Sequence, residues 1–119
     1  MDNLRRIHTV RQFDIWWADL PSPAGRRPVL LLSRNDAYQY LNKFIVAEIT
    51  TTIRGIPVEV KLGKREGLGT LCVANLDNVR TVARRWLGSR AGSLGPSRHR
   101  EVKQALGYAL GWEELIDLQ

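Results

Sequence analysis

The chain has 119 residues, of which 44% are hydrophobic, and its 18 Lys and Arg against 12 Asp and Glu give a net charge of +6. This length allows one domain with a modest core and excludes a cofactor-binding domain joined to a second domain. The positive charge favours a polyanionic partner such as nucleic acid, although many other soluble proteins are basic too.

Cysteine content and hydropathy exclude further classes of protein. The only cysteine, Cys72, lies in an apolar run, so we expect it to pack in the core. One cysteine excludes a disulfide framework or a thiolate metal cluster within one chain. No apolar run approaches the length of a membrane span. A soluble protein in a reducing cytoplasm, without membrane contact, fits these features.

Residues 1–12 are a basic leader that precedes the first strand and carries Arg5, Arg6 and Arg11. The leader has no apolar stretch long enough for a signal peptide. We interpret it as flexible, and the alternative is an arm that touches the phosphates of a nucleic acid. Residues 1–119 are expected to form one domain.

The first strand is predicted over residues 13–18, where the alternate residues Phe13, Ile15 and Trp17 are assigned to the core. This assignment places Trp16 on the other face. An exposed Trp16 would stack on a base or be buried in a dimer contact. The alternative is that Trp16 covers a second small cluster.

Two apolar segments, residues 26–33 and 46–55, are each typical of a buried strand with cations or hydroxyls at its end. Arg27 therefore lies where one strand begins, and Thr50 where the other ends. Pro28 restricts Arg27 to extended geometry. An arginine offers five donors and a permanent charge to a phosphate, and a threonine adds a hydroxyl. From the residues alone, solvated turn arginines and β-branched edge threonines remain the alternative.

The middle of the chain continues in short elements. A short helix is predicted over residues 35–41, strands over 43–50 and 57–62, and further β structure over 70–76 and 79–82. The turn residues between these segments separate them, and no internal repeat is present.

Residues 88–96 are rich in Gly and Ser and are predicted to connect the sheet to a closing helix, which Ser97 caps and Gly111 ends. The apolar stripe of this helix should dock on the sheet. It consists of Val102, Ala105, Leu106, Ala109 and Leu110. These elements predict an α+β fold, in which a strongly bent, barrel-like antiparallel sheet carries a short helix and a C-terminal helix.

The titratable residues do not indicate histidine or metal catalysis. His8 lies in the leader and His99 at the start of the last helix, so a two-histidine mechanism would need the termini to meet. The acidic residues are scattered singly, so we expect no metal and no cofactor. A second cationic group beside Asn78 would grip phosphates or bases, or is a solvated face. It comprises Arg80, Arg84 and Arg85.

Four motifs, taken in order, resemble the MazF/PemK family of toxin endoribonucleases. They are residues 14–20 (DIWWADL), 26–33 (RRPVLLLS), 49–60 (ITTTIRGIPVEV) and 76–82 (LDNVRTV), and the C-terminal helix fits as well. Each motif alone is weak. The ordered set, which covers residues 13–86, is more specific.

The resemblance implies an SH3-like (PemK/CcdB-like) barrel and a homodimeric, metal-independent RNase of a bacterial toxin-antitoxin pair. It maps the family's catalytic residues onto Arg27 and Thr50. We expect substrate-binding residues in the same segments, namely Arg26, Ser33, Thr51, Thr52, Arg54, Asn78 and Arg80. The family also implies a small acidic antitoxin whose extended tail covers the dimer groove, which suits a positively charged protein.

The implied reaction uses the 2′-hydroxyl of RNA, which attacks the adjacent phosphorus and leaves a 2′,3′-cyclic phosphate and a 5′-hydroxyl. Arg27 would stabilise the developing charge, because a guanidinium with a pKa above ~12 is a poor acid or base at neutral pH. Thr50 would hydrogen-bond the phosphate or the 2′-hydroxyl. The predicted function is a sequence-specific endoribonuclease toxin that cleaves mRNA or another RNA.

The first loop departs from the family pattern. Members commonly carry a longer loop with a Gly-Ser-Glu-Gln stretch, whereas residues 21–26 fill that space here without the acidic residue. The cleavage sequence and the mode of antitoxin binding therefore stay open, as does a structured substrate such as tRNA. Two other functions are alternatives: a non-nuclease, CcdB-like toxin that binds gyrase, and a basic SH3-like module that binds RNA without cutting it.

Overall fold

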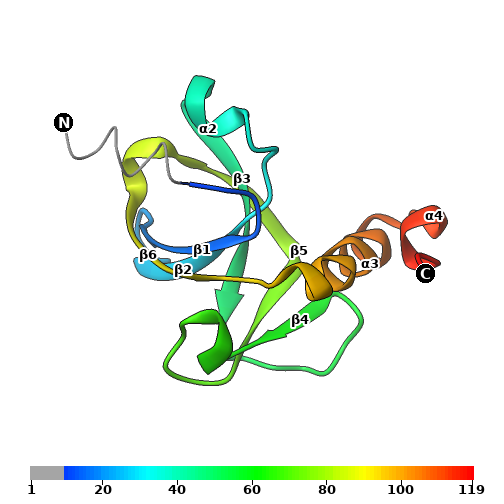
Figure 1. The fold of residues 1–119 in the computed structure, drawn as a ribbon. Coiled ribbons are helices and arrows are strands. Elements are labelled where there is room, and N and C mark those ends of the chain that lie inside the picture. Colours follow the sequence, from blue (N-terminus) through cyan, green and yellow to red (C-terminus); the bar gives the residue numbers. More distant parts are fainter. Residues whose placement is uncertain (1–9) are drawn as a thin grey trace.

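The computed structural model describes residues 10–119, which form one curled antiparallel sheet with a helix packed against it (Figure 1). The strands are β1 (Asp14–Asp19), β2 (Arg26–Leu31), β3 (Lys43–Thr50), β4 (Glu59–Leu62), β5 (Cys72–Ala83) and β6 (Leu87–Ser93). Their order in the sheet is β4-β5-β3-β2-β1-β6, and every neighbouring pair is antiparallel. The predicted α+β class with a strongly bent sheet is confirmed.

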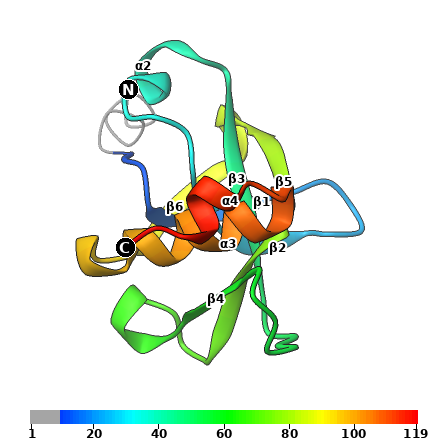
Figure 2. The same cartoon turned by 90° about the vertical axis from the view of Figure 1, so that its right-hand side faces the viewer.

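Three helices and three 3-10 turns accompany the strands in residues 10–119. The helices are α2 (Ala37–Tyr40), α3 (His99–Leu110) and α4 (Glu113–Ile116), and the 3-10 turns are η1 (Lys64–Glu66), η2 (Arg84–Trp86) and η3 (Pro96–Arg98). Helix α3 lies against β4 and β5 (Figure 2). The short helix predicted over residues 35–41 is confirmed as α2. Helix α4 was not predicted from the sequence.

The curl gives the sheet two apolar faces, and each face has its own cluster of buried side chains. One cluster lies under α3 and includes Ile15, Leu30 and Val102. The other includes Trp16, which is 2% exposed, with Phe44. The interpretation of Trp16 as part of a second cluster is correct, and an exposed Trp16 is wrong. Simple alternation fails here because a curled sheet buries both of its faces.

Two expectations for the β structure need correction. The segments predicted over residues 70–76 and 79–82 are one strand, β5, whose register on β3 shifts between Glu48↔Asn75 and Ala47↔Val79. Residues 76–78 therefore form a bulge and not a strand break. The predicted connection over residues 88–96 is largely strand β6, which pairs with β1.

The C-terminal helix matches the prediction at its end more closely than at its start. It stops at Gly111, whose φ of 70° is the left-handed conformation that glycine favours. Ser97 lies in η3 and does not cap α3, which begins at His99. Within the predicted stripe, Val102 and Ala105 are buried, whereas Leu110 is exposed because it occupies the last turn, beyond the sheet.

Part of the basic leader belongs to the folded body. Val10 is buried in the second cluster, and the backbone N–H of Gln12 donates to the side chain of Asn35. The rest of the leader, residues 1–9 with His8, lies outside the described residues. Between residues 10 and 119 the structure has no helix of sufficient length and hydrophobicity to cross a bilayer.

Candidate functional site

Three adjacent strands bring four polar residues to one face of the sheet. Val29 of β2 pairs with Glu48 of β3, and Val46 of β3 pairs with Arg80 of β5. Because side chains two positions apart in a strand share a face, Arg27 lies on the face of Glu48 and Arg80, and so does Thr50. We call Arg27, Glu48, Thr50 and Arg80 the cationic row.

Glu48 is the centre of the cationic row. Its Oε1 accepts a hydrogen bond from Nη1 of Arg27 at 3.2 Å, and its Oε2 lies 3.5 Å from Nη1 of Arg80. The carboxylate side chain is 19% exposed, and the two arginine side chains are 35% and 34% exposed. Two cations and one anion leave one excess positive charge at a surface that solvent and a ligand can reach.

One hydrogen bond, from Nη1 to Glu48, restrains the side chain of Arg27. It begins β2 immediately before Pro28, which favours extended backbone at residue 27 and directs the side chain along the face. Its Nε is buried and has no hydrogen-bond partner in residues 10–119, so Nη1 is the atom that anchors the guanidinium to the protein. A guanidinium carries five N–H donors. The donor on the buried Nε is out of reach of an anion, whereas those on Nη2 stay available.

Thr50 ends β3, and its hydroxyl is oriented by the backbone that follows. The N–H of Thr52 donates to Oγ1 of Thr50 at 3.1 Å. A hydroxyl whose oxygen already accepts one hydrogen bond retains its own O–H to donate. Thr50 is therefore arranged to donate toward an acceptor such as a phosphate oxygen.

The loop after Thr50 folds around one carboxylate. Glu59 accepts hydrogen bonds from the backbone N–H groups of Arg54, Gly55 and Ile56 at distances between 2.8 and 3.3 Å. Desolvation opposes the charged form of Glu59, but these hydrogen bonds and the Arg54 charge outweigh it and lower the pKa of the carboxyl. The loop is thus a defined structure, although its side chains, including those of Thr51, Thr52 and Arg54, are exposed.

The bulge of β5 lies beside the cationic row. Asn78 is exposed within it, and the N–H of Asp77 donates to Oδ1 of Asn75. Bulges redirect side chains next to binding sites. The predicted residues Asn78 and Arg80 are therefore both on the stretch of β5 that borders Glu48.

Other predicted residues lie apart from the cationic row. Arg26 is on the opposite face of β2, where its guanidinium carbon lies 5.0 Å from the centre of the Trp17 ring. Ser33 follows the far end of β2, is buried, and accepts a hydrogen bond from the Ile45 N–H. Arg84 donates to the carbonyls of Tyr38 and Leu41 and so supports the α2 region. Strand alternation separates Arg26 from Arg27, and the direction of β2 separates Ser33 from it.

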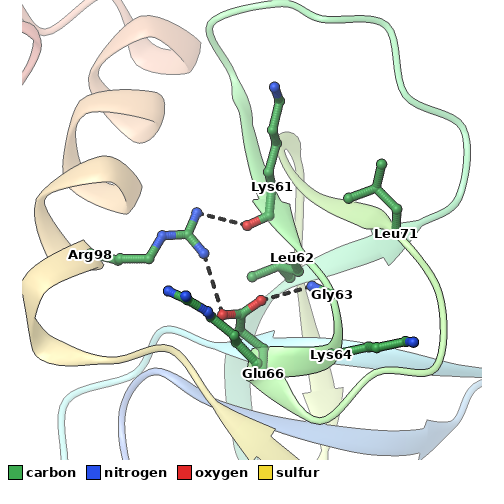
Figure 3. A pocket seen from close by; sticks show the side chains of 8 residues that line it. Lys61, Leu62, Gly63, Lys64, Glu66, Leu71 and Arg98 are labelled. Carbon is green, nitrogen blue, oxygen red and sulfur yellow. Dashed lines mark hydrogen bonds and ion pairs between the residues drawn. The ribbon is translucent and has the colours of Figure 1, made fainter.

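A second polar region lies between β4, η1 and the start of α3, where an open pocket of about 430 Å³ is lined by basic side chains (Figure 3). Arg98 crosses it and donates to the carbonyl of Lys61, while its Nη1 pairs with Glu66. Glu66 in turn accepts from the N–H of Gly63. These contacts tie η1 to the helix and use the donors of Arg98 within the fold.

Glu48 is the site residue that the sequence analysis missed. It was grouped with scattered acidic residues, but a carboxylate two positions before Thr50 in an apolar strand is a signal that places it on the same face.

Across residues 10–119, the structure shows no group of three or more His, Cys, Asp or Glu side chains suited to a metal ion. Cys72 is buried, as predicted.

Comparison with known proteins identifies the family of the chain. The sequence model of a family described as PemK-like, MazF-like toxin of type II toxin-antitoxin system matches residues 11–110. The probable endoribonuclease MazF5 of Mycobacterium tuberculosis is 38% identical over 98 residues, which cover 82% of this chain and 89% of that protein.

Solved structures show the same arrangement of elements. The Mycobacterium tuberculosis toxin MazF-mt6 aligns with a TM-score of 0.77 at 35% identity, over 82% of this chain and 96% of that one. An endoribonuclease in complex with its cognate antitoxin from Mycobacterial species aligns with a TM-score of 0.77 at 30% identity, over 87% and 97%.

These similarities confirm the predicted SH3-like, PemK/CcdB-like fold. They extend over nearly the whole length of the related proteins. The chain therefore belongs to the PemK-like, MazF-like family of toxins of type II toxin-antitoxin systems.

Proposed function

We propose that the protein is a sequence-specific, metal-independent endoribonuclease toxin of a toxin-antitoxin pair. The observation that carries this proposal is the cationic row, in which Arg27 and Thr50 share one sheet face beside Glu48 and Arg80. Support also comes from the relatives, which are named endoribonucleases. The substrate is RNA, because the reaction uses a 2′-hydroxyl as its nucleophile.

In the proposed reaction, Arg27 stabilises the negative charge that develops on the phosphate, using the donors that Glu48 does not occupy. Thr50 donates its hydroxyl hydrogen to a phosphate oxygen or the 2′-oxygen. Arg80 and Asn78 bind flanking phosphates or bases from β5. The loop residues Thr51, Thr52 and Arg54 extend this surface beyond the end of β3. The products are a 2′,3′-cyclic phosphate and a 5′-hydroxyl.

A homodimer is the assembly that we propose. Ile45 and Val79 are exposed, at 47% and 39%, although they lie on β3 and β5 in the interior of the sheet. They are diagonal neighbours across the strand pair, since Ile45 pairs with Thr81 and Ala47 with Val79. Apolar side chains at such a position favour cover by a second copy. Sedimentation of the purified protein measures this directly.

We also propose an acidic antitoxin partner and action in the cytoplasm, where RNA is accessible. The supporting observations are the net charge of +6 and the related endoribonuclease that was solved with its cognate antitoxin. An acidic segment would associate with the cationic row by charge complementarity, and its binding should weaken as the salt concentration rises.

The test is incubation of the purified protein with single-stranded RNA of random sequence in the presence of EDTA. We expect fragments that end in a 2′,3′-cyclic phosphate, and no cleavage of the matching DNA. Arg27→Ala should slow cleavage by roughly 100-fold or more, which is the usual cost of removing one stabilising donor.

The matched control is Arg34→Ala. Arg34 is exposed and forms an ion pair with Asp36 near α2, away from the cationic row. This variant should cleave RNA at the wild-type rate. Intact RNA with the wild type would contradict the proposal and favour a protein-binding toxin or an RNA-binding module, and equal rates for wild type and Arg27→Ala would contradict the assigned site.

A further inference from the structure

We propose that Glu48 is a positioning residue, whose carboxylate holds Arg27 in the orientation needed for the scissile phosphate. This inference rests on the proposed nuclease function and goes beyond it, because it assigns a role to an acidic side chain within a site that binds an anion. The inference rests on the two ion pairs that the Glu48 carboxylate makes and on the guanidinium donors that these ion pairs leave free.

The position of Glu48 is central. It lies on β3 between β2 and β5, so one carboxylate oxygen reaches Arg27 and the other reaches Arg80. The carboxylate therefore fixes the spacing of two guanidiniums that come from different strands. Without it, two like charges would share this face with nothing between them and would move apart.

The bond to Arg27 uses one nitrogen of the guanidinium, Nη1. An arginine side chain is long and has several rotatable bonds, so a single charge-assisted hydrogen bond restricts it strongly while most donors remain directed elsewhere. The backbone contributes as well, since Pro28 restricts residue 27. Glu48 and Pro28 together define where the free donors of Arg27 point.

Glu48 is not arranged to accept a proton from the substrate. Both of its oxygens are engaged with guanidinium groups, and the side chain is only 19% exposed. A general base must reach the proton that it removes, directly or through one water. The geometry thus points to a role exerted through Arg27 and not to contact with the reacting atoms.

The first experiment compares Glu48→Gln with wild type in steady-state cleavage of one defined RNA substrate. We expect kcat to fall by roughly 10- to 100-fold, which is typical when a catalytic group is misplaced by about 1 Å. KM should not rise by more than about threefold, because the loss of the carboxylate increases the excess positive charge that binds RNA. The matched control, Asp36→Asn, makes the same acid-to-amide change at an exposed ion pair near α2 and should leave kcat unchanged.

The second experiment is a double-mutant cycle with Arg27→Ala. If Glu48 acts through Arg27, then Glu48→Gln should cause no further loss of kcat in the Arg27→Ala background. A further loss of the same size as in the wild-type background would mean that Glu48 acts independently, for example as a base. That result would overturn the inference.

A structural readout keeps the inference testable if Glu48→Gln folds poorly. Glu48→Asp retains the charge but is one methylene shorter, so it should no longer span both arginines. In nitrogen-15 spectra, the Nε–H signal of Arg27, identified by its loss in Arg27→Lys, should shift and exchange faster with solvent in this variant. An unchanged signal, or unchanged kcat in both Glu48 variants, would overturn the inference.

The outcome for the wild type separates the two proposals. Cleavage by the wild type that depends on Arg27 but not on Glu48 would leave the nuclease function intact and overturn the positioning role alone. No cleavage by the wild type would overturn both.

Discussion

Two regions of this molecule place arginine beside glutamate, and they serve different purposes. In the cationic row, Glu48 contacts Arg27 and Arg80, and the arginine side chains are about one third exposed. At the junction of η1 and α3, Glu66 contacts Arg98, and the Glu66 side chain is 8% exposed. The residue types are the same, so the difference must come from the other partners of each guanidinium.

The donors of Arg98 are largely used within the fold. Its Nε and Nη2 donate to Glu101. Nη2 also donates to the carbonyl of Lys61, and Nη1 pairs with Glu66 (Figure 3). The hydrogen bond to Glu101 is the main reason that the pKa of Arg98 is raised above its ordinary value. Arg27, by contrast, is anchored through Nη1 alone. An arginine is available to a substrate only when the fold leaves its donors free.

The largest expected effect is on stability at the junction of η1, where the backbone of β6 packs closely against it. A Cβ on Gly92 would lie 2.1 Å from the carbonyl oxygen of Glu66, because β6 and η1 approach closely there. Gly92→Ala should therefore lower the free energy of unfolding by about 3 kcal/mol, the upper part of the usual range for overpacking. Chemical denaturation measures this change.

Gly69→Ala is the control for that prediction. Nothing lies within 4 Å of the position of its Cβ, so the variant should unfold close to the wild type. If Gly92→Ala were as stable as Gly69→Ala, the close approach of η1 and β6 would be contradicted.

Arg98→Met should separate stability from activity. It leaves the buried Glu66 carboxylate without its cation, which should cost about 2 kcal/mol, less than for a fully buried pair because Arg98 is partly exposed. RNA cleavage per folded molecule should stay at the wild-type level. Denaturation curves and initial rates measured on the same preparation test both parts, and a large loss of rate would end the distinction between the two regions.

Thr50→Val tests the cationic row with a substitution of similar side-chain volume. It removes the hydroxyl that the Thr52 N–H contacts, and we expect cleavage to slow by roughly 10-fold, in line with the loss of one hydrogen bond in the transition state. Thr81→Val is the matched control, since Thr81 lies on β5 opposite Ile45, outside the cationic row. Equal rates for the two variants would remove Thr50 from the site.

The smallest expected effect is a loss of stability in the loop after Thr50 at acidic pH. Because the pKa of Glu59 is lowered in the folded protein from its ordinary value of 4.5, its contribution to loop stability is present above pH 4.5. It should be lost as the pH falls through the lowered value. Amide hydrogen exchange at Gly55 should then accelerate relative to exchange in the core strands.

Glu59→Gln is the comparison for the acid effect. The amide cannot carry the charge that the three N–H groups stabilise, so exchange at Gly55 should be fast already at neutral pH and nearly independent of acid. Slow exchange in this variant would show that the carboxylate does not hold the loop.

Local pattern accounts for much of the fold. The strand predicted over residues 43–50 is observed with these bounds as β3, because an apolar, β-branched run bounded by turn residues depends little on context. The helix end at Gly111 was likewise predictable from residue type. Strand β6 was not, because a segment rich in Gly and Ser becomes a strand only through pairing with β1 and close contact with η1.

The candidate site was predictable to a similar degree. Arg27 and Thr50 stand at strand ends that the sequence marks, and Arg80 follows in a matched motif. Arg26 and Ser33 lie apart from Arg27, because a face and an end of β2 separate them from it. Glu48 was missed because its partners come from β2 and β5, and strand register decides which residues meet.

The sequence by itself determined the class of fold, the strands that carry Arg27 and Thr50, and the excess of positive charge. These properties depend on residue type and on periodicity over a few residues. Only the tertiary structure decided that Arg27 and Arg80 share Glu48 and keep donors free. It likewise decided that the donors of Arg98 bind Glu66, Glu101 and a backbone carbonyl. The physical reason is that these contacts join residues from different elements, which meet only when the sheet curls and its strands pair in one register.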